Sequence, residues 1–174
     1  TGNIYTELQL DNNPTTLIIG DNGSGKSTFL DALSFALYGK PFRKVSKPQL
    51  INSINQKDMK VQLHFDIGKN KYKIIRGAKP AVFEVWINNK MVNQDASVRD
   101  YQEYLEKHIL KLSFKAFSQV VVLGSTSFVP FMQLQTMHRR EVIEDLLDLQ
   151  IFSVMSLLLR ERVSTNEKEL ADIK

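Results

Sequence analysis

The 174-residue sequence predicts an α/β fold, and three consecutive features point to it. Residues 15–19 form a short β-branched and apolar run, which is typical of a buried strand in a parallel sheet. A glycine-rich stretch follows at once, from Gly20 to Ser27. After it, apolar residues recur at helical spacing until Gly39 ends the pattern. A strand, a glycine-rich turn and a helix in this order indicate an α/β domain, and the length allows it a real core.

An antiparallel β meander is predicted within residues 60–92. Apolar and polar residues alternate over residues 61–67, which is the period-two pattern of a half-buried strand. A glycine turn at residues 68–70 leads into a second strand, and a third strand is expected at residues 82–87. A further short strand is expected ahead of the glycine-rich stretch, at residues 7–10.

The second half of the chain predicts helices. Ser97 is placed to cap a helix that runs to about Leu112, and Thr136 is placed to cap another, periodic to Leu149. Between them, residues 119–123 predict a short buried segment. From residue 151 onward the chain can stay helical, because it holds neither glycine nor proline.

The terminal helix carries the spacing of a coiled-coil seam. An ordinary helix remains the alternative, since a coiled coil usually shows three or four heptads and two are present here. We therefore divide the chain into a lobe at residues 1–150 and the start of a coiled coil at residues 151–174. The seam residues follow a 4-3-4-3 spacing: Leu159, Val163, Asn166, Leu170 and Ile173.

Composition excludes several classes of protein. Cysteine is absent, so neither a disulfide framework nor a thiolate metal site is possible. No apolar run approaches the ~20 residues of a membrane-spanning helix, so we expect no membrane partner and a cytoplasmic location. The net charge is +4, but residues 40–80 hold eleven Lys and Arg against two acidic residues. That segment predicts a positive surface for phosphate backbones, with a solvated lysine-rich hairpin as the alternative.

The glycine-rich stretch matches a phosphate-binding loop, with a glycine, four residues, a second glycine, a lysine and a serine. Glycines let consecutive backbone N–H groups point inward at phosphates, and the following helix adds its positive dipole end. Lys26 supplies a cation for the β- and γ-phosphates, the Ser27 hydroxyl a ligand for Mg²⁺, and Thr28 a contact to the α-phosphate. The predicted nucleotide-binding residues are Asn22, Gly23, Ser24, Gly25, Lys26, Ser27 and Thr28.

The residues needed for hydrolysis are not evident. A P-loop nucleoside triphosphatase needs an acidic residue to hold Mg²⁺, and that residue usually lies at the end of an apolar strand beside the loop. The pair Glu144 and Asp145 falls inside a predicted helix, and no predicted core strand ends in a carboxylate. We therefore expect no catalytic residue in this chain, and His64, His108 and His138 show no metal-ligand spacing.

The order of these motifs resembles one family. The run GDNGSGKSTFLDALSFALYGKPF is followed by a basic meander containing KYKIIRG, by FSQVVVLG, and by RREVIEDLLDL leading into a long helix. It is similar to the ABC-type ATPase subunits of the DNA double-strand-break repair nuclease (the SbcC family), including the large recombination endonuclease subunits of T-even-type phages. The resemblance covers nearly the whole chain. It implies the N-terminal lobe of an ABC-type ATPase head.

The resemblance also implies ligands and partners. ATP and Mg²⁺ would bind the loop, with Ser27 and Gln119 directed at Mg²⁺, and a buried amide bonded to local backbone is the alternative for Gln119. The partners would be a C-terminal lobe of the same protein, a second head in a homodimer, a nuclease subunit and double-stranded DNA. Leu112, Ser113 and Phe114 are not the family signature, since the glycine is missing and no clear helix start follows.

The implied function is an ATP-binding lobe that regulates a partner nuclease at DNA ends, with negligible hydrolysis by this chain alone. Rival interpretations are a chromosome-structuring or recombination-mediator ATPase, a small P-loop kinase, and a scaffold that binds no nucleotide. The kinase is disfavoured because the three-strand insertion and the outgoing helix do not suit it. The candidates for DNA contact are four lysines of the meander: Lys69, Lys71, Lys73 and Lys79.

Overall fold

The computed structural model describes residues 5–43, 45–54, 56–92, 97–122, 131–147 and 149–173. The chain divides into two compact units, Thr1–Tyr101 and Gln102–Lys174, and each is described by itself. Within the described residues, no helix is both long and apolar enough to cross a membrane.

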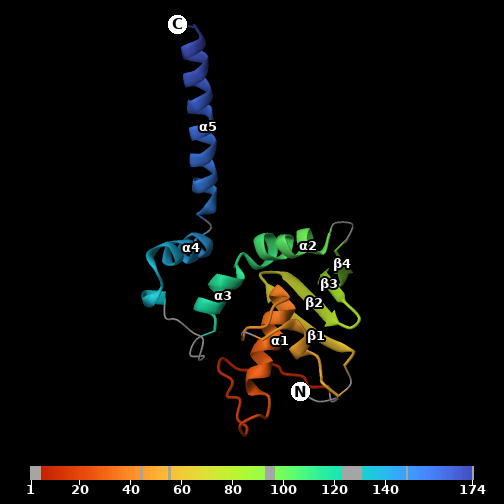
Figure 1. Ribbon diagram of the computed structural model, residues 1–174. Helices are drawn as coiled ribbons and strands as arrows, with labels where there is room; N and C mark the ends of the chain where they lie inside the picture. Colours follow the sequence, from red (N-terminus) through yellow and green to blue (C-terminus); the bar gives the residue numbers. More distant parts are fainter. Residues whose placement is uncertain are drawn as a thin grey trace. The chain divides into compact units, whose positions relative to one another are not determined.

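The first unit contains the predicted meander. Its sheet has the order β1-β2-β3-β4, and all neighbours pair antiparallel (Figure 1). The fourth strand was not predicted; it forms because Asn88 and Asn89 both adopt positive φ angles, 49° and 65°, as a tight two-residue hairpin requires. The strands are β1 (Met59–Ile67), β2 (Asn70–Ala78), β3 (Val82–Ile87) and β4 (Lys90–Met91).

One face of this sheet is packed, and we call it the packed face. Leu63, Ile74 and Val85 lie opposite one another across β1, β2 and β3, and Ile74 and Val85 are fully buried. The Tyr101 hydroxyl lies 3.4 Å from the Val85 carbonyl oxygen, to which it donates. The Tyr101 ring also packs edge-on against Phe83. The alternation predicted from sequence therefore holds for β1, whereas β2 buries three consecutive residues, Ile74, Ile75 and Arg76.

Helix α1 (Lys26–Tyr38) lies against β1 and β2 (Figure 1). Gly39 ends it in the left-handed conformation with φ 66°, and its N–H donates to Phe35 at 2.8 Å, so the predicted stop is confirmed. Arg76 of β2 connects the sheet to the C-terminal end of α1, because its Nε donates to the Ala36 carbonyl at 3.0 Å. Its guanidinium carbon lies 3.7 Å from the centre of the Phe83 ring, and the side chain is buried.

Two predicted strands are wrong: residues 7–10 and 15–19 form no strand. A strand exists only where a neighbouring chain takes up its backbone hydrogen bonds, and no described segment pairs with either one. Leu17 and Ile19 are accordingly 80% and 82% exposed. Residues 15–19, which precede the glycine-rich loop, thus have the composition of a strand but pair with no other strand in this structure.

The helices of the second half follow the prediction with several corrections. Ser97 does cap α2, since its Oγ accepts from the Asp100 N–H at 3.3 Å. The helix then widens into the π-helical segment η2, and Lys111 ends it with φ 50°. The elements are α2 (Val98–Tyr104), η2 (Leu105–Leu110), α3 (Phe114–Val120), η3 (Phe131–Gln133), α4 (Thr136–Leu146) and α5 (Gln150–Ile173), besides η1 (Lys47–Leu50) in the first unit.

A helix start follows Ser113, contrary to the prediction. The Ser113 Oγ accepts from the Ala116 N–H at 3.2 Å and so caps α3. Because of this cap, Gln119 lies on a helix rather than in the short buried segment that we expected. Val122 is buried but Val120 and Val121 are exposed, and residue 123 lies outside the described residues.

The last two helices also differ in detail. Gln135, not Thr136, occupies the cap position of α4, and Thr136 is its first helical residue. The helix ends at Leu146, three residues earlier than predicted. Helix α5 confirms that the chain stays helical through this region. The apolar side chains of α5 whose burial the structure describes are exposed, including Leu159, so the coiled coil remains a prediction.

Candidate nucleotide-binding loop

The loop ahead of α1 is curled. Gly23 and Gly25 take positive φ angles of 85° and 99°, which side chains with a Cβ rarely adopt. The Ser24 N–H donates to the Asp21 carbonyl at 3.2 Å, and the Thr28 N–H donates to the Gly25 carbonyl at 3.0 Å. These bonds reverse the chain within a few residues and lead it directly into α1.

Lys26 lies on this loop. Its Nζ donates to the Gly20 carbonyl at 2.5 Å and to the Asp21 carbonyl at 2.7 Å, and both contacts are exposed. The lysine is therefore not packed into an interior, and its ammonium sits at the mouth of the curled backbone. A positive charge at this point suits a polyanion that approaches the same loop.

The N-terminus of α1 offers further donors. Gly25 is its cap residue and provides no side-chain hydrogen bond, and the first turn holds no acidic residue. The positive end of the helix dipole is thus not offset by a carboxylate of that turn. Asn22, Gly23, Ser24 and Ser27 are exposed beside it. A curled loop, an ammonium bonded to the carbonyls of that loop and an open helix N-terminus together make a candidate anion-binding site.

Gln119, in the second unit, carries a buried oxygen without a partner. Its Oε1 is buried and accepts no hydrogen bond from the described residues. This disfavours the alternative in which the amide oxygen satisfies local backbone. An uncharged oxygen of this kind fits a hard cation such as Mg²⁺. Ser27 is exposed in the first unit, and the assignment of Ser27 and Gln119 as Mg²⁺ ligands stays a prediction.

Comparison with known proteins identifies the family. The family described as an AAA domain matches residues 3–174. The chain belongs to this family. AAA domains of this kind are P-loop ATPase domains, and here the P-loop accompanies an antiparallel sheet and helices.

The resemblance predicted from sequence is confirmed by individual relatives. The chain is 46% identical over 152 residues to exonuclease subunit 2 of Enterobacteria phage T4 and 44% identical over 157 residues to that of Escherichia phage RB69. It is 25% identical over 182 residues to a subunit of the nuclease SbcCD from Staphylococcus aureus (strain Newman). These alignments cover 87%, 90% and 95% of the chain but only 27%, 28% and 18% of the relatives, so the chain spans about a quarter or less of their length.

The acidic pair of this AAA domain lies where the sequence predicts it. Glu144 and Asp145 are inside α4, and the Arg140 Nε donates to Glu144 at 2.7 Å. Among the described residues, no group of three or more His, Asp or Glu side chains is arranged to hold a metal ion.

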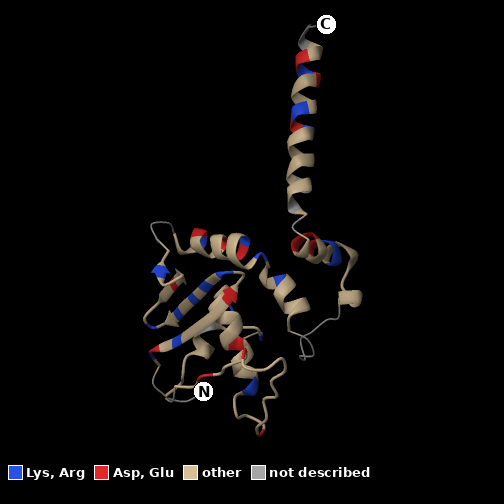
Figure 2. Cartoon of the chain, turned by 180° about the vertical axis from the view of Figure 1, so that it is seen from behind, with Lys and Arg blue, Asp and Glu red and all other residues tan. Residues whose placement is uncertain are grey.

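The four candidate DNA-contact lysines do not form one patch. Lys71 and Lys73 lie on the same face of β2, opposite to the packed face, and Lys69 is in the turn before that strand. Lys79 follows the other end of β2, and a strand of this length separates it from Lys69 by about 30 Å. Figure 2 shows blue segments along the strands of the sheet. A single ligand at Lys71 and Lys73 would not need Lys79.

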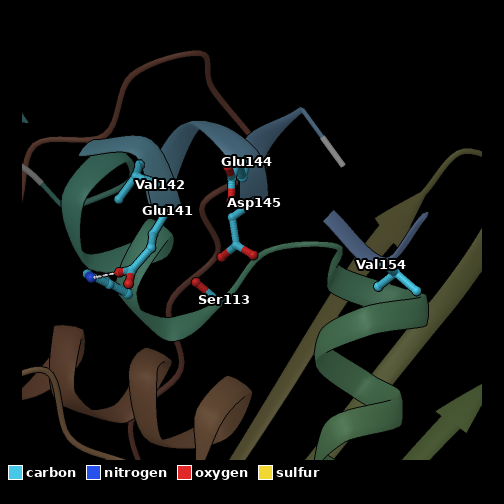
Figure 3. A pocket seen from close by; sticks show the side chains of 7 residues that line it. Ser113, Glu141, Val142, Glu144, Asp145 and Val154 are labelled. Carbon is cyan, nitrogen blue, oxygen red and sulfur yellow. Dashed lines mark hydrogen bonds and ion pairs between the residues drawn. The ribbon is translucent and has the colours of Figure 1, made fainter. Parts of the chain in front are cut away.

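Sequence reasoning missed a second cluster, which joins α3 to α4. Glu141 pairs with Lys115, and His138 Nδ1 lies 2.8 Å from Lys115 Nζ. The hydrogen bond from Lys115, followed by that from His138, lowers the pKa of the Glu141 carboxyl. The cluster borders a recess of about 450 Å³ that Ser113 and Val142 also line (Figure 3). Lys115 lies 23 positions from His138 and 26 from Glu141 in the sequence, so no local motif predicts the cluster.

Proposed function

We propose that this chain is the ATP-binding lobe of a DNA repair and recombination ATPase, which regulates a partner nuclease at DNA ends through ATP-driven dimerisation of its heads. The observation that carries the proposal is the curled loop with Lys26 across its mouth at an open helix N-terminus. The names of the relatives, an exonuclease subunit and a nuclease subunit, support the nuclease partner.

ATP would bind along the loop. The N–H groups from Asn22 to Gly25 would surround the α- and β-phosphates, because the two positive φ angles curl that backbone. Lys26 would leave the loop carbonyls for the β- and γ-phosphates, where an ammonium gains a charge-assisted partner. Thr28 would contact the α-phosphate. Mg²⁺ would take the Ser27 hydroxyl and the Gln119 oxygen as protein ligands, and it supplies charge neutralisation for the γ-phosphate.

The remainder of an ABC-type head would come from a C-terminal lobe of the same protein. Residues 15–19, two threonines followed by three apolar residues, are exposed and unpaired, as expected of a strand whose sheet neighbour belongs to another segment. We divide the chain at residue 150, where α5 would begin a coiled coil. A second head would close the nucleotide site, and double-stranded DNA would meet the lysines of the sheet.

Nucleotide binding tests the first step. In thermal denaturation of the chain, Mg-ATP at about 100 times its dissociation constant stabilises the fold by ~2.7 kcal/mol if the loop binds it. Lys26→Ala should abolish this shift, while Lys107→Ala, which removes an exposed lysine paired with Glu103, should keep it. No shift in the unaltered chain would leave the scaffold interpretation.

Turnover is the second measurement. We expect negligible hydrolysis of Mg-ATP by the chain alone, because no described strand beside the loop supplies a catalytic carboxylate. Substantial turnover that Lys26→Ala removes would contradict a lobe that needs a second half. Phosphate transfer to nucleoside monophosphates would instead favour the kinase.

A further inference from the structure

The face of the sheet opposite to the packed face carries an organised row of side chains. We call it the outer face. The strand register places one residue from each of the four strands directly opposite the next: His64, Lys73, Trp86 and Met91. His64 and Met91 are exposed, and Lys73 and Trp86 are half-buried. The row therefore presents two aromatic rings and an ammonium across the full width of the sheet.

The indole of Trp86 is held in place. Its Nε1 donates to the Glu84 carboxylate at 2.9 Å, and the Lys73 ammonium lies 4.1 Å from the ring centre. At the far side of the row, the His64 ring is within 2.6 Å of the Gln62 amide. Rings fixed in this manner lose little freedom when a flat ligand stacks on them. A cation–π contact that solvent can reach is weak, so Lys73 can move to a nearby anion.

The charges around this row favour an anion. Lys60 and Lys71 are exposed on the same face as Lys73. Of the two carboxylates there, Glu84 is engaged by the indole, and Asp66 forms no ion pair with Lys71 within the described residues although the two are opposite each other. The outer face thus combines aromatic rings with a positive surplus.

We propose that the outer face binds single-stranded DNA, with an unpaired base stacked on Trp86 and the adjoining phosphates at Lys71 and Lys73. Exposed aromatic rings on a sheet accept unpaired bases because every base has a flat face, and flanking cations follow the backbone. A duplex keeps its bases stacked on one another, so it could use the lysines but not the indole. This inference takes from the proposed function only that the ligand is DNA, and it does not require ATP binding.

Trp86 is the single tryptophan in the sequence, so its fluorescence reports on its own contacts. An oligothymidylate of about 12 nucleotides is long enough, because single-strand-binding domains cover about 4–16 nucleotides. Titration with this strand should quench the Trp86 emission to saturation. A duplex of the same length should bind without comparable quenching. Binding of single strands without quenching, or equal quenching by the duplex, would overturn the proposal.

Variants separate stacking from charge. Trp86→Leu should weaken single-strand binding about tenfold while leaving duplex binding unchanged. Lys73→Gln should lower the slope of log affinity against log salt by about 0.7, the contribution of one phosphate on a single strand. Lys90→Gln is the matched control, because Lys90 pairs with Ile87 and so belongs to the other face of the sheet. An unchanged affinity in Trp86→Leu, measured by polarisation of a labelled strand, would refute base stacking.

Two further readouts keep the outcomes distinct. Trp86→Phe retains a ring, so it should recover most of the affinity that Trp86→Leu loses, whereas a general loss of folding would affect both. Mg-ATP binding is measured on the same samples with a fluorescent nucleotide. Loss of nucleotide binding with quenching intact would contradict the proposed function alone, and the reverse result would contradict this inference alone.

Discussion

Asp31 in α1 holds Arg43 by its backbone and by its side chain. One carboxylate oxygen accepts from the Arg43 N–H at 3.0 Å, and the other accepts from Arg43 Nε at 2.7 Å and from its Nη2. Asp31 is 1% exposed and the Arg43 side chain is 48% exposed. The buried carboxylate of Asp31 therefore holds the segment that follows α1 against that helix.

Arg43→Ala should destabilise the fold by about 2–4 kcal/mol, since it leaves the buried Asp31 carboxylate without its cation. Asp31→Asn should cost less, because the released guanidinium can reach water and the amide oxygen still accepts from the backbone. Urea unfolding gives both values. If Asp31→Asn proves the more harmful change, the pair does not act through the buried carboxylate.

Gly39→Ala should cost more stability than Gly68→Ala. Both residues have positive φ angles, 66° and 60°, so both substitutions carry the backbone penalty of about 1 kcal/mol. A Cβ at Gly39 would also lie 2.5 Å from Arg76 Nη1, whereas a Cβ at Gly68 has nothing within 4 Å. The extra loss of unfolding free energy in Gly39→Ala, relative to Gly68→Ala, measures the cost of displacing Arg76. Equal losses would show that Arg76 moves aside at no cost.

Gln119→Leu should have opposite effects on stability and on Mg²⁺ dependence. Without nucleotide it removes a buried oxygen that lacks a donor, so stability should rise by about 1 kcal/mol. With ATP it removes a proposed Mg²⁺ ligand, so the gain in nucleotide affinity on adding Mg²⁺ should shrink. Gln102→Leu is the control, because that amide is bonded to Glu106 on a helix surface. A loss of stability in Gln119→Leu would show that the oxygen has a structural partner.

Glu141 should contribute an acid-dependent part of the stability. Its folded pKa is lowered by the hydrogen bond from Lys115 and then by that from His138. The stabilisation is therefore complete above the ordinary value of 4.5 and is lost as the pH falls through the lower, folded pKa. Glu141→Gln should flatten the fall in urea midpoint over this acidic range. Glu169→Gln on α5 removes the same charge outside the cluster and should leave the curve unchanged.

The sequence predicts well those elements whose ends are fixed by local chemistry. Gly39 ends α1 because it reaches the left-handed conformation without strain, and Gly68 turns β1 into β2 for the same reason. The period-two pattern identified β1 because its apolar side chains lie on the packed face and its polar side chains on the exposed one. For the candidate site, the residue spacing predicted a curled loop that leads into a helix, and that geometry is present.

Features that depend on distant partners could not be predicted. Residues 15–19 have the composition of a strand, but composition does not say which segment pairs with them. Arg76 would be expected to face solvent, and its burial is explained by the positions of α1 and of the Phe83 ring. The contact of Lys26 with Gly20 and Asp21 and the isolated oxygen of Gln119 likewise arise from tertiary geometry.

The unpaired residues 15–19 have a consequence for handling this protein. They are uncharged, β-branched in part and free of proline, and an exposed, unpaired segment of this composition recruits identical copies through intermolecular β pairing. If no other segment pairs with residues 15–19, preparations of the chain should aggregate as the protein concentration rises. Co-production of the chain with the segment that pairs with residues 15–19 should therefore reduce this aggregation.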